Sequence, residues 1–164
     1  MTTLIRVAKP EDAAAIAAIY NHYVANDIAT FEEEPVDAEI MAGRIADVLG
    51  KSLPWLVAED GGIILGYSYA GSWKPRSAYR YSVESTVYVD AAAKLRGIGT
   101  ELYSALIAEL RAHNIHAVIG GVSLPNEVSE RLHEKLGFKK VAHFEQVGFK
   151  FGKWIDIGYW QLLF

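Results

Sequence analysis

The sequence, 164 residues long, contains no cysteine. Disulfide bonds, thiolate metal sites and a reaction that passes through a cysteine-bound intermediate are therefore excluded. Apolar runs of roughly 18 residues, which a membrane-spanning helix needs, are also absent, and the first residues, MTTLIRVAKPED, lack the apolar core of a signal peptide. We therefore expect a cytoplasmic protein without membrane contact.

An excess of basic residues is missing as well. The 16 lysines and arginines are outnumbered by 20 aspartates and glutamates, which gives a formal charge of -4. Because nucleic-acid-binding proteins normally carry a basic balance or patch, we expect no nucleic-acid partner. His113 and His116 have no acidic or thiolate residue beside them, so we expect no metal site either.

The residues that are present alternate between strand-type and helix-type patterns. In chain order these patterns are β, α, α, β, β, β, α, β, α, β, β, with turn signals at residues 60–62 and 151–153. The order predicts one α/β domain over residues 1–164, with a mixed sheet flanked by helices. The buried stripes expected of the second and the last helix include Ile40 and Val128.

A strand, a glycine-rich turn and a helix occupy residues 84–110. An apolar run that ends at Val89 leads through Gly97 and Gly99 into a helix with Leu102 and Leu106 on its apolar face. The first N–H groups of a helix have no acceptor within it, the helix dipole adds partial positive charge, and glycine lets a ligand approach the backbone. This stretch therefore predicts an anion site.

Two familiar phosphate motifs do not fit this turn. A dinucleotide-binding fingerprint needs a third glycine where the sequence has Leu102. A P-loop closes with Gly-Lys-Ser/Thr, whereas here Gly99 is followed by Thr100 and Glu101.

The turn instead resembles the Gln/Arg-x-x-Gly-x-Gly/Ala signature of the GNAT superfamily of acetyl-CoA-dependent N-acetyltransferases. Residues 94–99, KLRGIG, match it with Lys94 where the family usually has Gln or Arg. Further motifs resemble the phosphinothricin and methionine sulfoximine acetyltransferase branch over nearly the whole chain. These motifs are IYNHYV at 19–24, WKPRSAY at 73–79, ESTVYV at 84–89, LPN at 124–126, RLHEKLGF at 131–138 and GFKFGKW at 148–154.

The resemblance implies a GNAT-type fold, with a central mixed, mostly antiparallel, seven-stranded sheet flanked by four helices. It also implies acetyl-CoA as cosubstrate, its pyrophosphate held by the backbone of the turn and its pantetheine arm lying along the preceding strand. The residues implied in this binding are Val87, Tyr88, Val89, Lys94, Leu95, Arg96, Gly97, Ile98, Gly99, Thr100 and Asn126. Asn126 could also cap the last helix, and the two roles are compatible.

Acetyl transfer to an amine needs a neutral amine, stabilisation of an oxyanion and a proton for the departing thiolate. An α-amino group is largely protonated near neutral pH, so a base must remove its proton. Glu84 matches the glutamate that has this role in the resembled branch; the alternative is a surface glutamate at a strand end. His133 stands where most of the superfamily has a tyrosine that protonates the thiolate; the alternative is a structural helical histidine.

The loop before Glu84 carries a cluster that suits an amino-acid substrate. An arginine can grip a carboxylate or phosphinate while the amine faces the base. In the resembled branch the residues matching Lys74, Arg76 and Tyr79 contact substrate. The full set that we expect to bind substrate is Phe31, Lys74, Arg76, Tyr79, Glu84, Ser85 and Thr86, although Phe31 could equally belong to the core.

These observations predict N-acetylation of a small amino acid or analogue, of the methionine sulfoximine, methionine sulfone or phosphinothricin type. Without cysteine, transfer should be direct, in a ternary complex. The resemblance also implies a homodimer. Two alternatives stay open: an acetyltransferase of polyamines, which the acidic residues 32–34 would suit, or of peptide N-termini, and a non-catalytic coenzyme A-binding sensor.

Overall fold

The computed structural model describes residues 2–94 and 96–164. Within these residues seven strands form one sheet, in the order β1-β2-β3-β4-β5-β7-β6. The strands are Leu4–Val7 (β1), Trp55–Asp60 (β2), Ile63–Ser72 (β3), Ser82–Val89 (β4), Ala117–Leu124 (β5), Lys139–Lys150 (β6) and Lys153–Leu163 (β7). In this described part β4 and β5 pair in parallel, and the other neighbours are antiparallel. The predicted mixed, mostly antiparallel sheet is confirmed.

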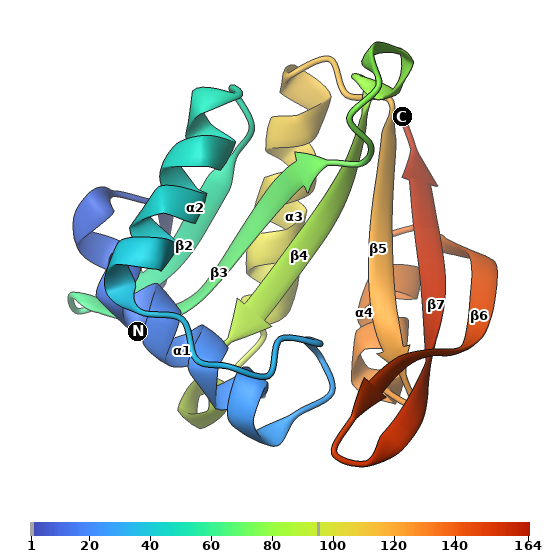
Figure 1. Ribbon diagram of the computed structural model, residues 1–164. Coiled ribbons are helices and arrows are strands. Elements are labelled where there is room, and N and C mark those ends of the chain that lie inside the picture. The colour runs from blue at the N-terminus through green and yellow to red at the C-terminus, as the bar shows by residue number, and fades with distance from the viewer. Residues whose placement is uncertain (1, 95) are drawn as a thin grey trace.

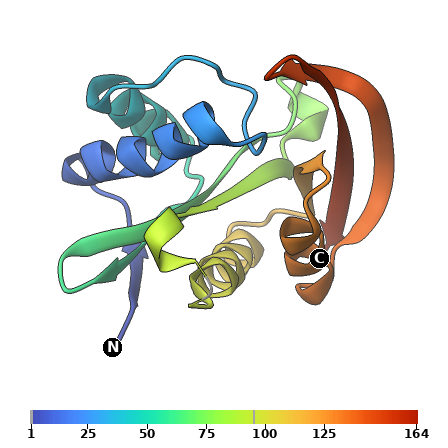
Figure 2. The same ribbon diagram turned by 90° about the horizontal axis from the view of Figure 1, so that it is seen from below.

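Four α-helices in the described residues cover the two faces of the sheet. They are Ala13–Asn26 (α1), Ala38–Gly50 (α2), Ile98–Ala112 (α3) and Glu127–Lys135 (α4), and short 3-10 helices lie at Pro10–Asp12, Ser77–Tyr79 and Ala91–Ala93. α1 and α2 lie on one face, and α3 and α4 on the other (Figures 1 and 2). None of the described helices is long and apolar enough to cross a membrane.

Each face of the sheet has its own apolar core, because successive side chains of a strand point to opposite faces. In β2, Trp55 and Val57 pack with α1 and α2, whereas Leu56 and Ala58 pack with α3. The expected stripe of α3, which includes Leu102, is fully buried.

Two members of the expected helix stripes are exposed. Ile40 of α2 is 51% exposed and Val128 of α4 is 80% exposed, so both predictions of burial are wrong. α4 spans 9 residues, and the side chain that it buries most deeply is that of His133. Val128, five residues earlier, instead lies at the wall of the cavity described below.

The sheet divides between β4 and β5. In the described residues their pairing covers Ser82–Ala117, Val83–Val118 and Glu84–Ile119, after which the two strands diverge (Figure 1). The remaining part of β4 therefore pairs with β3 on one side, while its edge toward β5 is open. This division places a cleft in the middle of the sheet.

Candidate active site

The cleft contains a cavity of about 790 Å³, a volume typical of ligand sites. One wall comes from β4 and the glycine turn, the opposite wall from α4 and the end of β5, and the third from the loop between α1 and α2, residues 27–37. The described residues predicted as site members that line it are Phe31, Glu84, Ser85, Thr86, Val87, Tyr88, Val89, Lys94, Gly97, Ile98, Gly99, Thr100, Asn126 and His133. Leu95 lies outside the described residues.

The turn has the geometry of an anion cradle. Gly97 is the N-terminal cap of α3 and has φ +78°, a left-handed conformation that favours glycine. Gly97 has no side chain to cap the helix, and among the described residues no acceptor is found for the N–H groups of residues 98–100, which can therefore face a ligand in the cavity. Lys94 lies beside this turn, with its ammonium 5.2 Å from the ring centroid of Tyr23. Arg96 points elsewhere, toward Asp60, at 3.2 Å.

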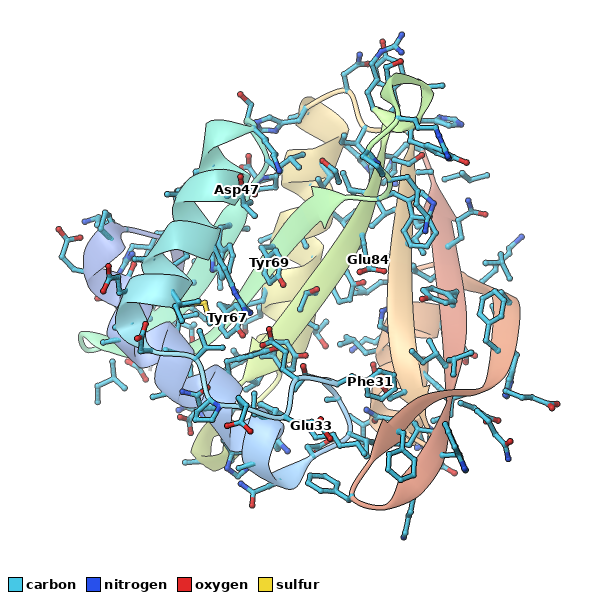
Figure 3. All side chains as sticks on the ribbon, viewed as in Figure 1. Phe31, Glu33, Asp47, Tyr67, Tyr69 and Glu84 are labelled. Carbon is cyan, nitrogen blue, oxygen red and sulfur yellow. The ribbon has the colours of Figure 1, made fainter. Side chains whose placement is uncertain are left out.

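Glu84 lies at the point where β4 and β5 separate. Figure 3 shows it on β4, beside Tyr69 of β3. Its carboxyl group meets the solvent of the cavity, but the walls of the cleft raise its pKa by excluding part of the surrounding water, and the positive charge of Lys74 opposes this rise. A carboxylate with a raised pKa in a cleft is suited to accept a proton near neutral pH.

His133 is 4% exposed and forms hydrogen bonds through both ring nitrogens. Nδ1 lies 2.7 Å from the carbonyl oxygen of Ser129, so Nδ1 carries a hydrogen. Burial lowers the pKa of His133, so the ring is neutral and Nε2 is an acceptor. The hydroxyl of Tyr103, 3.0 Å away, therefore donates to Nε2.

A buried chain of hydrogen bonds follows from this assignment. Because Tyr103 gives its hydrogen to His133, its oxygen accepts from the hydroxyl of Ser85, and the Ile119 carbonyl, 3.4 Å from Ser85, is the weaker acceptor. Gly120 of β5 makes room for the chain, because a Cβ there would overlap Nε2 of His133. The sequence motifs pointed to His133 but gave no signal for Tyr103 or Gly120.

Asn126 combines two positions that the sequence left open. Its side-chain oxygen accepts from the N–H of Ser129 at 3.1 Å, which is the expected N-cap of α4. The residue also lines the cavity. The hydrogen bond to Ser129 fixes the orientation of the Asn126 side chain. Because Asn126 also lines the cavity, it could contact the pantetheine arm of a bound cofactor.

The loop cluster ahead of Glu84 is dispersed in the structure. Lys74 lines a smaller groove of about 290 Å³, together with Trp73, Tyr159 and side chains of β6, and its charge acts on Glu84. Arg76 and Tyr79 are exposed, and neither is among the described residues that line the cavity. Within one chain, Lys74 therefore lies close enough to act electrostatically on Glu84, whereas Arg76 and Tyr79 lie outside the cavity.

Several residues of the cavity wall were not singled out from the sequence. They are Tyr20, Tyr23, Tyr69, Tyr103, Arg131 and Lys135 among others. Arg131 and Lys135 lie on α4 and line the cavity near the turn; Arg131 forms an exposed ion pair with Glu127 at 3.3 Å, a weak contact that it could exchange for a phosphate. Arg131 and Lys135 fall inside the RLHEKLGF motif, which was the available signal.

These features fit acetyl-CoA. Its phosphates suit the free N–H groups of α3 and the cations around them, and an arm rich in amide groups suits the open edge of β4. Among residues 2–94 and 96–164, no three histidines or acids are grouped so that they could hold a metal ion.

The sequence model of the acetyltransferase (GNAT) domain matches residues 5–158. The chain therefore belongs to this family and is an acetyl-CoA-dependent N-acetyltransferase. It is 40% identical over 157 residues to a phosphinothricin N-acetyltransferase of Streptomyces viridochromogenes, covering 96% of this chain and 85% of that protein.

Two further relatives are similar over almost the full chain. An L-methionine sulfoximine/L-methionine sulfone acetyltransferase of Salmonella typhimurium is 40% identical over an aligned length of 161 residues, and the alignment covers 96% of this chain and 92% of the relative. The crystal structure of a phosphinothricin acetyltransferase from Sinorhizobium meliloti in complex with acetyl-CoA matches with a TM-score of 0.96 and 35% identity, covering 99% of this chain and 89% of that one.

Proposed function

We propose that residues 1–164 act as one N-acetyltransferase domain that acetylates the α-amino group of a small amino acid or analogue, by direct transfer in a ternary complex. The observation that carries this proposal is the position of Glu84, at the branch point of the sheet where the cofactor wall and the amine wall meet. The names of the relatives support methionine sulfoximine, methionine sulfone or phosphinothricin as the substrate type.

Bound acetyl-CoA supplies an activated acetyl group. In this proposal the N–H groups at residues 98–100 hold its pyrophosphate, Lys94, Arg131 and Lys135 add positive charge, and the open edge of β4 at residues 87–89 orients its arm. The contribution of the chain is to place the acetyl group beside Glu84 and away from bulk water.

Glu84 is the general base. The raised pKa of this carboxyl brings it closer to that of the ammonium group from which it takes a proton, directly or through water. Lys74, whose charge acts on Glu84, attracts the carboxylate of the substrate. Phe31 and Tyr69 form the walls on either side of the amine.

Tyr103 carries the proton that the departing sulfur needs. The one N–H group of the neutral His133 is held by Ser129, whereas the hydrogen of the Tyr103 hydroxyl, which bonds Nε2 of His133 in the resting site, can pass from Nε2 to the departing sulfur. Burial raises the pKa of Tyr103, so its oxygen takes a proton back from water once the thiol has left. His133 is then a positioning residue, which orients that hydroxyl through Nε2.

A homodimer is part of the proposal. Large apolar side chains are exposed on the β6–β7 hairpin, among them Phe149, Phe151 and Trp154. Burying such a patch against a second copy would remove it from water. Arg76 and Tyr79 lie outside the cavity of their own chain. In a dimer they could contact the second copy instead.

A panel of amines tests the proposed function. Methionine sulfoximine, methionine sulfone, phosphinothricin, spermidine and a short peptide are each incubated with acetyl-CoA, and thiol release is measured. We expect acetylation of the amino-acid analogues above the other two. A preference for spermidine or the peptide would contradict the substrate class, and binding of acetyl-CoA without turnover on any amine would favour the sensor. Radiolabelled acetyl that stays on the enzyme and then passes to an amine would contradict direct transfer.

A further inference from the structure

Lys150, the last residue of β6, is buried although it carries an ammonium group. Its side chain is 2% exposed. Nζ donates to the carbonyl oxygens of Asp27 at 2.7 Å, Thr30 at 2.8 Å and Tyr23 at 3.3 Å. The three N–H donors of a lysine thus meet three backbone carbonyls, more than a hundred residues earlier in the chain.

The position of these carbonyls explains why a lysine is accepted there. Tyr23 belongs to the last turn of α1, and Asp27 is its C-terminal cap. The last turn of α1, all of which is described, contains no basic residue. Carbonyl groups at a helix C-terminus carry partial negative charge, which the ammonium of Lys150 neutralises from outside the helix. Burial lowers the pKa of Lys150, and the charges of Asp27 and Glu33 oppose this.

A second contact joins the same two segments. Phe31, in the loop after α1, lies on Gly148 of β6, where a Cβ would overlap the ring. Phe31 also lines the cavity (Figure 3). The β6 strand therefore contacts the loop twice: Gly148 packs against the ring of Phe31, and Lys150, two residues later, bonds the loop carbonyls.

These two contacts cross the cleft. α1 and its loop cover the part of the sheet formed by β1 to β4, whereas β6 belongs to the part formed by β5, β7 and β6 (Figures 1 and 2). In the described residues the two parts pair directly at 82–84 with 117–119. Lys150 and Phe31 add a connection past Glu84, where β4 and β5 have separated, on the face of the sheet that α1 and α2 cover.

From this geometry we infer that Lys150 is a positioning residue for the amine, because it fixes the loop that carries Phe31 and so sets the width of the amine end of the cleft. The inference rests on the proposed function, in which an amine binds between Phe31 and Glu84. Loss of Lys150 should widen that end, weaken amine binding and reduce discrimination between amines, while the turn at 94–100 keeps its affinity for acetyl-CoA.

The absence of cysteine allows a direct test. Lys150→Met removes the ammonium, and Lys150→Gln, which keeps two N–H donors, is the second variant should Lys150→Met fail to fold. Lys150→Cys can be aminoethylated in denaturant and refolded, which restores an ammonium group at this position and at no other. The matched control is Lys153, its exposed strand partner across the hairpin turn, changed in the same ways.

We expect the KM for the amine to rise by about tenfold to a hundredfold in the Lys150 variants, because small displacements remote from the chemistry can have effects of this size. The KM for acetyl-CoA should stay within about twofold, and aminoethylation of the Lys150→Cys variant should restore the amine KM. The Lys153 variants should match the wild type. Hydrogen exchange at residues 27–32 should accelerate in Lys150→Met but not in Lys153→Met.

The inference is overturned if the amine KM and the exchange of the loop both stay at wild-type values. A parallel loss of amine and acetyl-CoA affinity, or failure of both Lys150→Met and Lys150→Gln to fold, would also overturn it, because Lys150 would then support the fold as a whole. If the wild type acetylates no amine, the proposed function fails, and the exchange measurement still judges whether Lys150 holds the loop.

Discussion

The two ends of the cleft are built in different ways. At the cofactor end, one continuous stretch, residues 84–100, supplies a strand edge and a helix N-terminus, and the groups that it offers are largely backbone N–H and C=O. At the proposed amine end the walls are side chains from separate elements, Phe31 of the α1–α2 loop and Tyr69 of β3, and Lys150 of β6 holds the loop that carries Phe31. We therefore expect the cofactor end to tolerate side-chain changes that the amine end does not.

Glu84, where the two ends meet, should give the largest effect. In Glu84→Gln the side chain keeps its size but loses the ability to accept a proton, and we expect kcat/KM for the amine to fall by about 10²- to 10⁴-fold. In the wild type, activity should fall as the pH drops through the pKa of Glu84, and this limb should lie above the ordinary value of 4.5 because the pKa is raised. Steady-state kinetics across pH measures both.

The control for this variant is Glu145→Gln, an exposed glutamate of β6. It should retain wild-type kinetics, and the affinity of Glu84→Gln for acetyl-CoA should stay unchanged. Full turnover in Glu84→Gln, or an unaltered acidic limb, would remove Glu84 from its assigned role.

Tyr103 should give the next largest effect. Tyr103→Phe removes the hydroxyl between Ser85 and His133, and we expect kcat to fall by about tenfold to a hundredfold with little change in either KM. The change also leaves Nε2 of His133 without a donor, which should cost about 1 to 3 kcal/mol of stability, so the assay belongs well below the melting temperature.

Tyr81→Phe, at an exposed tyrosine, is the matched control. If Tyr103→Phe lowers stability but leaves kcat intact, the buried chain is structural, and the proton reaches the thiolate by another route.

The contrast between the two ends also explains what could be predicted from the sequence. The order of the elements and the glycine turn before α3 depend on local patterns, namely apolar periodicity and two glycines between a strand and a helix, so both were predicted. Glu84 was assigned as base from its match to the resembled branch; the structure places it in the cavity wall, and its role stays a prediction.

The rest depends on contacts between distant residues. Arg76 and Tyr79 precede Glu84 closely in the sequence, but the 3-10 helix Ser77–Tyr79 carries them away from the cavity of their own chain. The contact of Lys150 could not be predicted, because the sequence does not show that β6 ends beside the C-terminus of α1. Helical periodicity placed Val128 on the apolar face of α4, but it could not show whether another element covers that face at Val128, and the residue is exposed.

A smaller effect should appear in stability. Since the cleft raises the pKa of Glu84 above its value in the unfolded chain, the folded state binds more protons between these two values, and its stability falls as pH rises through them. Glu84→Gln carries no charge at this position and avoids the loss. We expect its free energy of unfolding near neutral pH to exceed that of the wild type by about 0.5 to 1 kcal/mol. The gain is small because the carboxylate of the wild type still meets solvent. Thermal unfolding should show the difference disappearing below about pH 4. Equal stability at neutral pH would mean that the cleft does not desolvate this carboxylate.

The smallest effect is expected at Lys94, where the sequence departs from the family signature. Its ammonium lies over the ring of Tyr23, and the N–H groups at residues 98–100 remain in place when its side chain changes. Lys94→Gln should therefore alter the KM for acetyl-CoA by less than about twofold. Gly97→Ala provides the contrast, because an alanine at φ +78° is strained by about 1 to 2 kcal/mol, and the displaced turn should raise the same KM severalfold. If Lys94→Gln proved the more damaging of the two, the cofactor end would depend on side chains as the amine end does, and the difference between the two ends would disappear.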